Sequence, residues 1–202
     1  MKGILLLNGE PYLGKIDCAD SVVYCCDGAY TWAKDRVRID KTVGDFDSLG
    51  YIPTPLPEEI YPSEKNFTDG EIALYKMISA GIDDIVIYGG GGGREDHFLG
   101  NLQLLYAAHK RGVRASMITA GAAIFAADGR VELGGYVGKT FSVLPFGECV
   151  HIMDSRGCKY SYPPSIALGE CRGISNIVES SAAYVRIKEG DTALVIVNRG
   201  SV

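Results

Sequence analysis

Residues 84–112 read DIVIYGGGGGREDHFLGNLQLLYAAHKRG, an apolar run followed by five glycines and a segment with helical spacing. The β-branched content of residues 84–88 predicts a buried strand. After the glycines, Asp96 is expected to cap a helix in which Leu99, Leu102 and Tyr106 recur on one face. A strand, a glycine turn and a helix in this order predict a parallel sheet that is covered by helices.

The same alternation extends to both sides of this stretch. Apolar runs at residues 4–7, 22–26 and 116–119 predict further strands. Thr68 and Glu71 have the spacing of a capping box, which predicts a helix that begins at Thr68. We therefore expect residues 1–121 to form an α/β domain with a mainly parallel sheet, and ligand sites at the carboxyl ends of its strands.

The second half of the chain has a different pattern. Short apolar runs separated by glycine-containing turns predict strands at residues 124–127, 130–133, 140–144, 150–153, 159–162, 183–188 and 193–197. No helical period of useful length interrupts them. Residues 122–202 are thus predicted to form an antiparallel β-sandwich domain.

Composition narrows the classes of function. The 202 residues are 47% hydrophobic and 22% charged, as in ordinary globular proteins, and the net charge of −5 provides no broad positive field for a nucleic acid. The apolar run at residues 4–7 is too short for a signal peptide, and no run approaches the length of a membrane span. Six cysteines without a CxxC pair predict reduced thiols. We expect a cytoplasmic protein with neither nucleic-acid nor membrane partners.

Four acids are placed where a metal site is expected. Asp27, Asp45 and Asp47 come directly after predicted strands, and Asp69 lies in the first turn of a helix. Carboxylates that gather closely repel one another unless a cation lies between them, and Mg²⁺ bound to carboxylates and substrate phosphates is the usual arrangement. For Asp69 alone a simple helix-start role is favoured, because acids are common there.

The glycine run predicts a phosphate-binding loop, since bare backbone N–H groups can approach an anion near a helix N-terminus. The spacing of its glycines does not match the dinucleotide-binding fingerprint. His97 is a lone histidine at a helix start, and such a residue is more often structural than catalytic. Arg94 adds a fixed cation suited to phosphate. A second glycine pattern at residues 9–15 reads G-x-x-x-x-G-K, but Ile16 stands where a hydroxyl residue is needed, so we predict an ordinary loop.

In this order, several segments resemble the thiamin pyrophosphokinase family. They are Asp27-Gly28, GDFDS at 44–48, residues 65–74, GGREDH at 92–97 with Asn101-Leu102, residues 157–160 and residues 173–176. The resemblance implies transfer of a diphosphate group from Mg·ATP to the hydroxyl of thiamin, with release of AMP. It also implies that residues 1–121 bind Mg·ATP and that residues 122–202 bind thiamin and form a homodimer, with thiamin sites between subunits.

The resemblance also implies roles for single residues. The catalytic Mg²⁺ ligands are Asp45, Asp47 and Asp69. The nucleotide-binding residues are Asp27, Gly28, Gly92, Gly93, Arg94, Asp96 and His97, and the thiamin-binding residues are Lys65, Asn66, Ser175 and Asn176. One position departs from the family pattern, because Asn66 stands where the family usually has an aspartate, and a neutral amide brings no charge to a metal.

Two other functions fit the same residues. A Mg-dependent nucleotide phosphohydrolase would use these acids with water as the nucleophile. A non-catalytic protein that binds a nucleotide or thiamin diphosphate would bind the ligands without turnover. The three hypotheses differ in ATP turnover: the diphosphate transferase requires thiamin for it, the phosphohydrolase does not, and the binding protein shows none.

Overall fold

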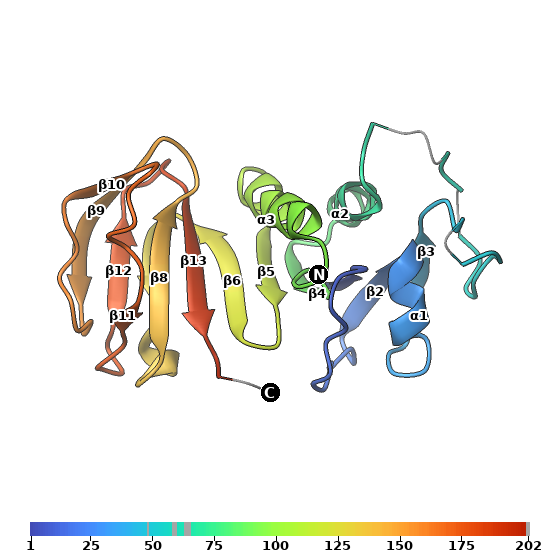
Figure 1. Ribbon diagram of the computed structural model, residues 1–202, viewed down its shortest axis with the longest axis horizontal. Helices are drawn as coiled ribbons and strands as arrows, with labels where there is room; N and C mark the ends of the chain where they lie inside the picture. The colour runs from blue at the N-terminus through green and yellow to red at the C-terminus, as the bar shows by residue number, and fades with distance from the viewer. Residues whose placement is uncertain (48, 58–59, 63–65, 201–202) are drawn as a thin grey trace. The chain divides into compact units, whose positions relative to one another are not determined.

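The computed structural model describes residues 1–47, 49–57, 60–62 and 66–200 (Figure 1). The chain forms two compact units, Met1–Ala120 and Gly121–Val202. Within the described ranges, no helix combines the length and the apolar character that crossing a membrane requires.

The first unit is built on a parallel sheet. Its strands are β1 (Lys2–Leu6), β2 (Ser21–Cys26), β3 (Lys41–Val43), β4 (Asp84–Tyr88) and β5 (Arg114–Ile118). Their order is β5-β4-β1-β2-β3, and each neighbouring pair is parallel. The strands around the glycine run that the sequence predicts are therefore present, with ends that differ by one or two residues.

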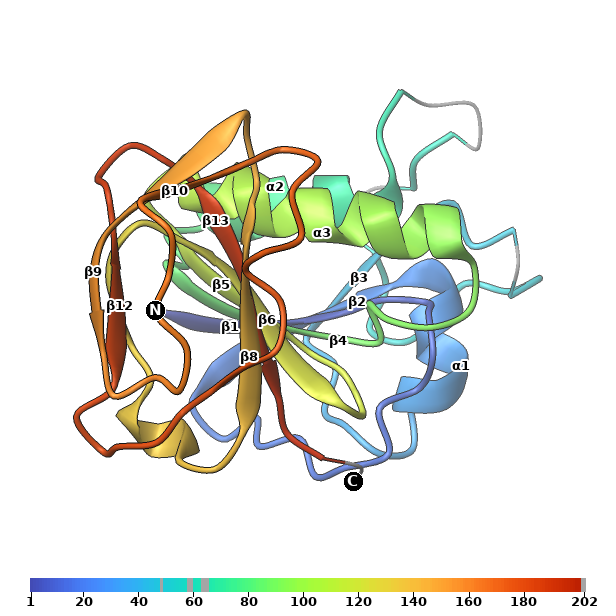
Figure 2. The same cartoon turned by 60° about the vertical axis from the view of Figure 1, so that its left-hand side comes forward.

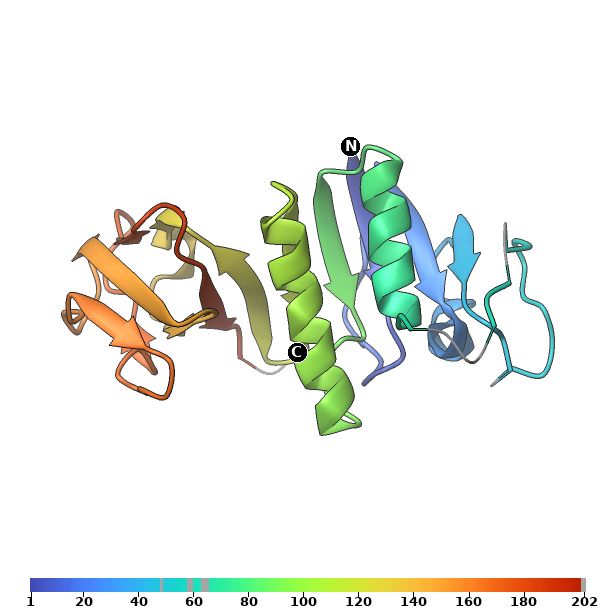
Figure 3. The ribbon, with the colours of Figure 1, turned by 90° about the horizontal axis from the view of Figure 1, so that it is seen from above.

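Two long helices cover one face of this sheet, α2 (Asp69–Ser79) and α3 (Glu95–His109), which lie side by side in Figure 3. The predicted capping box of α2 is confirmed: the Glu71 N–H donates to Thr68 Oγ1 at 3.2 Å, and the Thr68 N–H donates to the Glu71 carboxylate at 3.4 Å. The helix buries Ala73, Leu74 and Met77. A short 3₁₀ turn (η1, Asp27–Ala29) and helix α1 (Tyr30–Ala33) come after β2.

The prediction that Asp96 caps the second long helix is wrong. The residue at the N-cap is Arg94, which makes no side-chain capping bond, and the helix begins at Glu95. Asp96 lies inside the first turn, where its carboxylate accepts hydrogen bonds from Arg94. Because the Asp96 carboxylate is paired with the neighbouring Arg94 side chain, it does not cap the helix.

The P-loop-like pattern at residues 9–15 forms a loop, as predicted. No helix comes directly after it in the described chain, and β2 begins at Ser21. Instead, the N–H groups of Gly9 and Glu10 donate to the carbonyls of Gly89 and Gly91, both at 2.7 Å. The segment therefore borders the glycine loop.

The strands of the second unit pair antiparallel and lie in two sheets. Their orders are β11-β8-β13-β6 and β10-β9-β12-β7. Figure 2 shows β9 and β12 to one side of β8 and β13. Side chains from both sheets share one core, among them Phe141, Val185 and Val195. The strands are β6 (Ala122–Ala127), β7 (Gly129–Glu132), β8 (Thr140–Pro145), β9 (Cys149–Arg156), β10 (Ser165–Ala167), β11 (Asn176–Ile177), β12 (Tyr184–Ile187) and β13 (Ala193–Asn198).

One strand predicted in this unit is wrong. Residues 159–162 form no strand; only Cys158 makes an isolated bridge, with Val178. The N–H and the carbonyl of Tyr160 are hydrogen-bonded to the side-chain amide of Asn176. These two backbone groups therefore pair with a side chain in place of a neighbouring strand. The short strands β10 and β11, and a 3₁₀ turn at Gly134–Tyr136 (η2), were not predicted. All six cysteines are free.

Candidate active site

The strand register of the first unit brings the predicted site segments to one edge. Leu6 lies beside Cys25 on one neighbouring strand and beside Tyr88 on the other, and Cys26 lies beside Val43. The segments that leave these strands therefore start at the same carboxyl edge of the sheet. Those segments are Asp27 after β2, residues 44–47 after β3 and residues 89–93 after β4.

Asp27, Asp45 and Asp47 converge at this edge. One carboxylate oxygen from each lies within 4.8 Å of the other two. Asp27 is 6% exposed, Asp45 is half-buried and Asp47 is exposed, so the cluster opens from the interior to the surface. Three like charges at this distance favour a cation between them. A donor set made only of carboxylate oxygens suits Mg²⁺.

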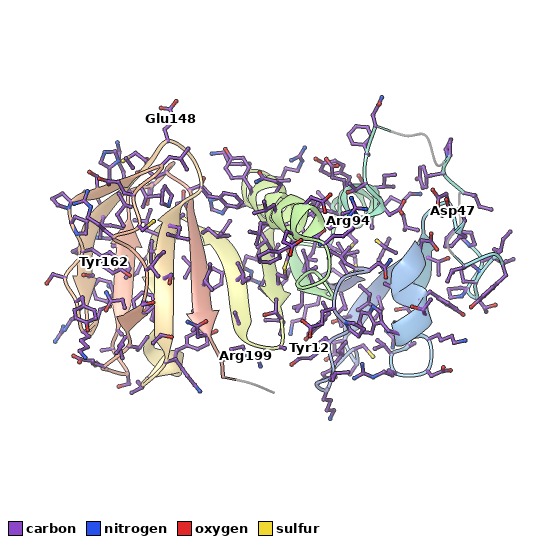
Figure 4. The ribbon with its side chains drawn as sticks, viewed as in Figure 1. Tyr12, Asp47, Arg94, Glu148, Tyr162 and Arg199 are labelled. Carbon is purple, nitrogen blue, oxygen red and sulfur yellow. The ribbon has the colours of Figure 1, made fainter. Side chains whose placement is uncertain are left out.

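The turn that carries two of these acids has an unusual backbone at Phe46. Phe46 has a φ of 60° in the left-handed region and is 4% exposed. A bulky residue adopts this conformation at a cost, and it persists where the surrounding packing enforces it. The Asp47 N–H donates to Asp45 Oδ1 at 3.4 Å across the turn. Burial of the Phe46 ring thus fixes the backbone from which both carboxylates extend; Asp47 is labelled in Figure 4.

The glycine loop forms the next part of the edge. Gly92 and Gly93 have φ values of 65° and 71°, which a side chain would strain. The next residue, Arg94, donates two hydrogen bonds to the Asp96 carboxylate, of 3.1 and 2.6 Å. These bonds lower the pKa of Asp96 to about 2. Arg94 and Asp96 are both exposed, so the paired guanidinium faces solvent (Figure 4).

The polar segment of the second unit is built around Asn176. This side chain is 5% exposed; its Oδ1 accepts from the N–H groups of Tyr160 (3.0 Å) and Ile177 (2.8 Å), and its Nδ2 donates to the Tyr160 carbonyl at 2.8 Å. Ser175 beside it is exposed, has a φ of 63°, and donates its N–H to Ser142 Oγ at 3.1 Å. Asn176 therefore holds two segments of this unit together.

A model of the family described as "Thiamin pyrophosphokinase, catalytic domain" matches residues 15–117, which is half of the chain. The chain belongs to the thiamin pyrophosphokinase family. The matched residues include the acid cluster, α2, the glycine loop and α3.

Individual relatives agree with this membership. The thiamine pyrophosphokinase of Bacillus subtilis (strain 168) is 35% identical over 142 residues, which cover 66% of this chain and 66% of that protein, slightly under two thirds of each. The crystal structure of the thiamine pyrophosphokinase from Bacillus subtilis is 25% identical, with a TM-score of 0.82 and full coverage of both chains. The crystal structure of the thiamin pyrophosphokinase from Geobacillus thermodenitrificans is 24% identical, with a TM-score of 0.80. The match covers 100% of this chain and 99% of that chain, and it shows a shared fold.

Among the residues that resemble family motifs, the structure brings some together and leaves others apart. Asp27, predicted beside the nucleotide, lies in the acid cluster, whereas Asp69 is not part of that group in the described chain. Asp69 is the first residue of α2 and is half-buried. Asn66 is exposed three residues earlier, and Lys65 lies outside the described residues. His97 is exposed and donates its N–H to Asp96 at 2.9 Å.

Two further residues beside this edge of the sheet, Asn8 and Asn101, were given no individual role from the sequence. A Cβ atom at Gly28 would lie 2.0 Å from Asn8 Nδ2, so the Asn8 amide covers this glycine. Asn101 donates from Nδ2 to the Gly90 carbonyl at 2.9 Å. Asn8 comes directly after the predicted strand at residues 4–7, and a polar residue at such a position is a signal that could have revealed it.

Proposed function

We propose that this chain transfers a diphosphate group from Mg·ATP to the hydroxyl of thiamin and releases AMP. The observation that carries the proposal is the convergence of Asp27, Asp45 and Asp47 at the same sheet edge as the glycine loop, in a member of the thiamin pyrophosphokinase family. An acid cluster beside a phosphate-binding loop is an arrangement suited to a metal-bound nucleotide.

The three clustered acids would hold Mg²⁺. When it is bound, the ion neutralises charge on the phosphate oxygens. Asp27 supplies the buried side of the site and Asp47 the open side, so the site faces solvent where the phosphates would enter. We propose that Asp69, which lies at the N-terminus of α2 and outside the cluster, contributes to the phosphate site as a catalytic carboxylate.

The other residues of the edge would bind and orient the nucleotide. The N–H groups of Gly92 and Gly93 would bind phosphate oxygens, Arg94 would add a planar cation, and Asp96 and His97 would complete the nucleotide site with Gly28. Attack of the thiamin hydroxyl forms a bond between its oxygen and the β-phosphorus, breaks the bond between that phosphorus and the oxygen that leaves with AMP, and releases the hydroxyl proton to solvent. Because negative charge develops on the transferred group and on AMP, in-line positioning and the cation Arg94 supply most of the catalysis.

We further propose that the first unit is the Mg·ATP-binding catalytic domain, and that the second is a β-sandwich that binds thiamin and forms a homodimer. Ser175 and Asn176, with Lys65 and Asn66, would form the thiamin site. The exposed side chain of Ser175 supports direct contact with thiamin, whereas the bonds of Asn176 support an indirect role through the Tyr160 backbone.

One chromatographic assay tests the reaction. The purified chain is incubated with ATP and MgCl₂, with and without thiamin, and nucleotides and thiamin diphosphate are quantified. Equal amounts of AMP and thiamin diphosphate, formed only when thiamin is present, are expected. Nucleotide hydrolysis without thiamin would instead favour the phosphohydrolase, and ligand-induced thermal stabilisation without turnover would favour the binding protein.

A further inference from the structure

Three consecutive carbonyls of the glycine loop are each held by a donor from another segment. The carbonyls of Gly89 and Gly91 accept from the N–H groups of Gly9 and Glu10, both at 2.7 Å. The carbonyl between them, that of Gly90, accepts from Asn101 Nδ2 at 2.9 Å. Two of the three donors are thus backbone groups, and the third is a side chain of α3.

These bonds also fix the N–H groups of the loop. A peptide unit is planar and trans, so the carbonyl of one residue and the N–H of the next point in opposite directions. The bond to the Gly90 carbonyl therefore sets the direction of the Gly91 N–H. Within the part of the chain that the structure describes, no acceptor is found for the N–H groups of residues 90–93. Those of residues 90–92, which follow the three held carbonyls, are oriented donors of the kind that bind anions at the start of a helix.

A peptide between two glycines rotates with little steric resistance, because glycine adopts both signs of φ. Neighbouring side chains restrict Gly90 and Gly91 on one side: a Cβ at Gly90 would lie 2.8 Å from Met117, and one at Gly91 would lie 2.8 Å from Thr119. Those apolar contacts limit space but do not distinguish the two directions of the peptide. The hydrogen bond from Asn101 Nδ2 to the Gly90 carbonyl, at 2.9 Å, stabilises the direction that the structure shows.

We infer that Asn101 is a positioning residue for nucleotide binding: by holding the Gly90 carbonyl, it keeps the Gly91 N–H directed at the phosphates of ATP. This inference rests on the proposed function for the identity of the ligand. Asn101 itself is half-buried in the second turn of α3, where asparagine is a poor helix former, so local helix stability does not account for it.

The test compares Asn101→Ala and Asn101→Asp with the wild type. Alanine removes the donor, whereas aspartate keeps the shape and presents only acceptors to the carbonyl. We expect the dissociation constant of MgATP, measured by calorimetry without thiamin, to rise at least ~10-fold for alanine and further for aspartate, a factor of ten corresponding to ~1.4 kcal/mol. In turnover assays, KM for ATP should rise while KM for thiamin stays within about twofold.

The control is Gln103→Ala, an exposed position on the same helix, which should leave both constants unchanged. Thermal melting without nucleotide identifies variants that retain the fold, and the near-isosteric aspartate variant decides the matter if the alanine variant unfolds. A folded variant that binds MgATP within twofold of wild type would overturn the inference. If the wild type binds MgATP but converts no thiamin, the proposed reaction fails while the comparison still decides the role of Asn101; absence of MgATP binding would overturn both.

Discussion

Gly44 and Asp27 are in direct contact: a Cβ atom at Gly44 would lie 2.7 Å from the Cβ of Asp27. Observed Cβ atoms do not approach each other so closely, so a larger residue at position 44 must displace the aspartate or the turn. Cys26 on β2 is paired with Val43 on β3. Asp27 directly follows Cys26 and Gly44 directly follows Val43, so this register brings Asp27 and Gly44 into contact. Absence of a side chain at Gly44 is therefore a condition for the position of Asp27 in the acid cluster.

Gly44→Ala should weaken Mg²⁺ binding. Displacement of the buried Asp27 carboxylate would separate it from Asp45 and Asp47, and we expect the Mg²⁺ concentration for half-maximal activity to rise roughly 10-fold, with about 1–3 kcal/mol lost from folding stability. Mg²⁺ titration of turnover and chemical denaturation measure the two effects. Gly100→Ala is the matched control, because a Cβ there meets no atom within 4 Å; an unchanged Mg²⁺ requirement in Gly44→Ala would contradict the argument.

Asp47→Asn should lower turnover by roughly 100-fold without changing the melting temperature. Asp47 is exposed, so the substitution removes charge from the cluster but no apolar packing. The steady-state rate with ATP, Mg²⁺ and thiamin is compared with that of Asp35→Asn, an exposed acid after α1 that should retain full activity. Near-normal turnover of the Asp47 variant would remove this residue from the metal site.

Asp69→Asn separates a structural from a catalytic role. As the first residue of α2, Asp69 stabilises the helix through its charge, an effect of about 0.3–1 kcal/mol. If the carboxylate also acts on the phosphates, turnover should fall by roughly 100-fold, far more than this change in stability explains. Rate and denaturation midpoint are measured on the same preparation, and a loss of stability with unchanged turnover would leave Asp69 as a helix-start residue.

Asn66→Asp restores the charge that the family pattern usually has, and we expect it to lower the Mg²⁺ concentration for half-maximal activity. Asn66 is exposed, so the new carboxylate adds charge without a burial cost. Asn66→Ala serves as the control, since it changes the side chain without adding charge and should not reduce the Mg²⁺ requirement. Identical titrations for the aspartate variant and the wild type would show that position 66 does not face the metal.

The elements that could be predicted from the sequence are those decided by neighbouring residues. The strand at 84–88 has its own β-branched content, and α2 begins where Thr68 and Glu71 bond to each other three residues apart. The segment at 159–162 has the composition of a strand, but its conformation is decided by Asn176, sixteen residues beyond Tyr160. No local pattern contains that bond.

The candidate site shows the same limit. The sequence places Asp27, Asp45 and Asp47 after strands, and so predicts that they share an edge. The pairing of β2 with β3 and the contact at Gly44 put Asp27 beside Asp45 and Asp47, and no local pattern contains either feature. Asp69 is not in this group of three within the described residues. The sequence likewise predicts Asp96 as a helix cap, whereas in the structure its carboxylate is hydrogen-bonded to Arg94.

Asn176→Ala should destabilise the fold. Its amide bonds to the N–H and carbonyl of Tyr160 and to the N–H of Ile177, and truncation leaves these groups without their partner. A loss of about 1–3 kcal/mol is expected in urea denaturation. Ser175→Ala, at the exposed neighbouring position, should change stability by no more than about 0.5 kcal/mol. Equal stabilities of the two variants would contradict the positioning role of Asn176.

The proposed homodimer can be tested by complementation between two inactive subunits. We call residues 157–160 and 173–176, which Asn176 holds together, the thiamin segment. Tyr160→Ala combined with Ser175→Ala removes two exposed side chains from it and preserves the bonds of Asn176 to the Tyr160 backbone. This double variant should weaken thiamin binding and spare ATP binding. Asp47→Asn in the other subunit removes the metal-directed charge instead.

If the thiamin segment of one subunit completes the site over the acid cluster of the other, a mixed dimer of these variants contains one site in which both halves are intact. Neither parent homodimer has such a site. Co-expression with two affinity tags and sequential purification isolates the mixed dimer, whose activity should reach about half that of the wild type, because one of two sites is restored. Activity no higher than that of the parents, in a mixed dimer of confirmed composition, would mean that each subunit builds its site from its own two units.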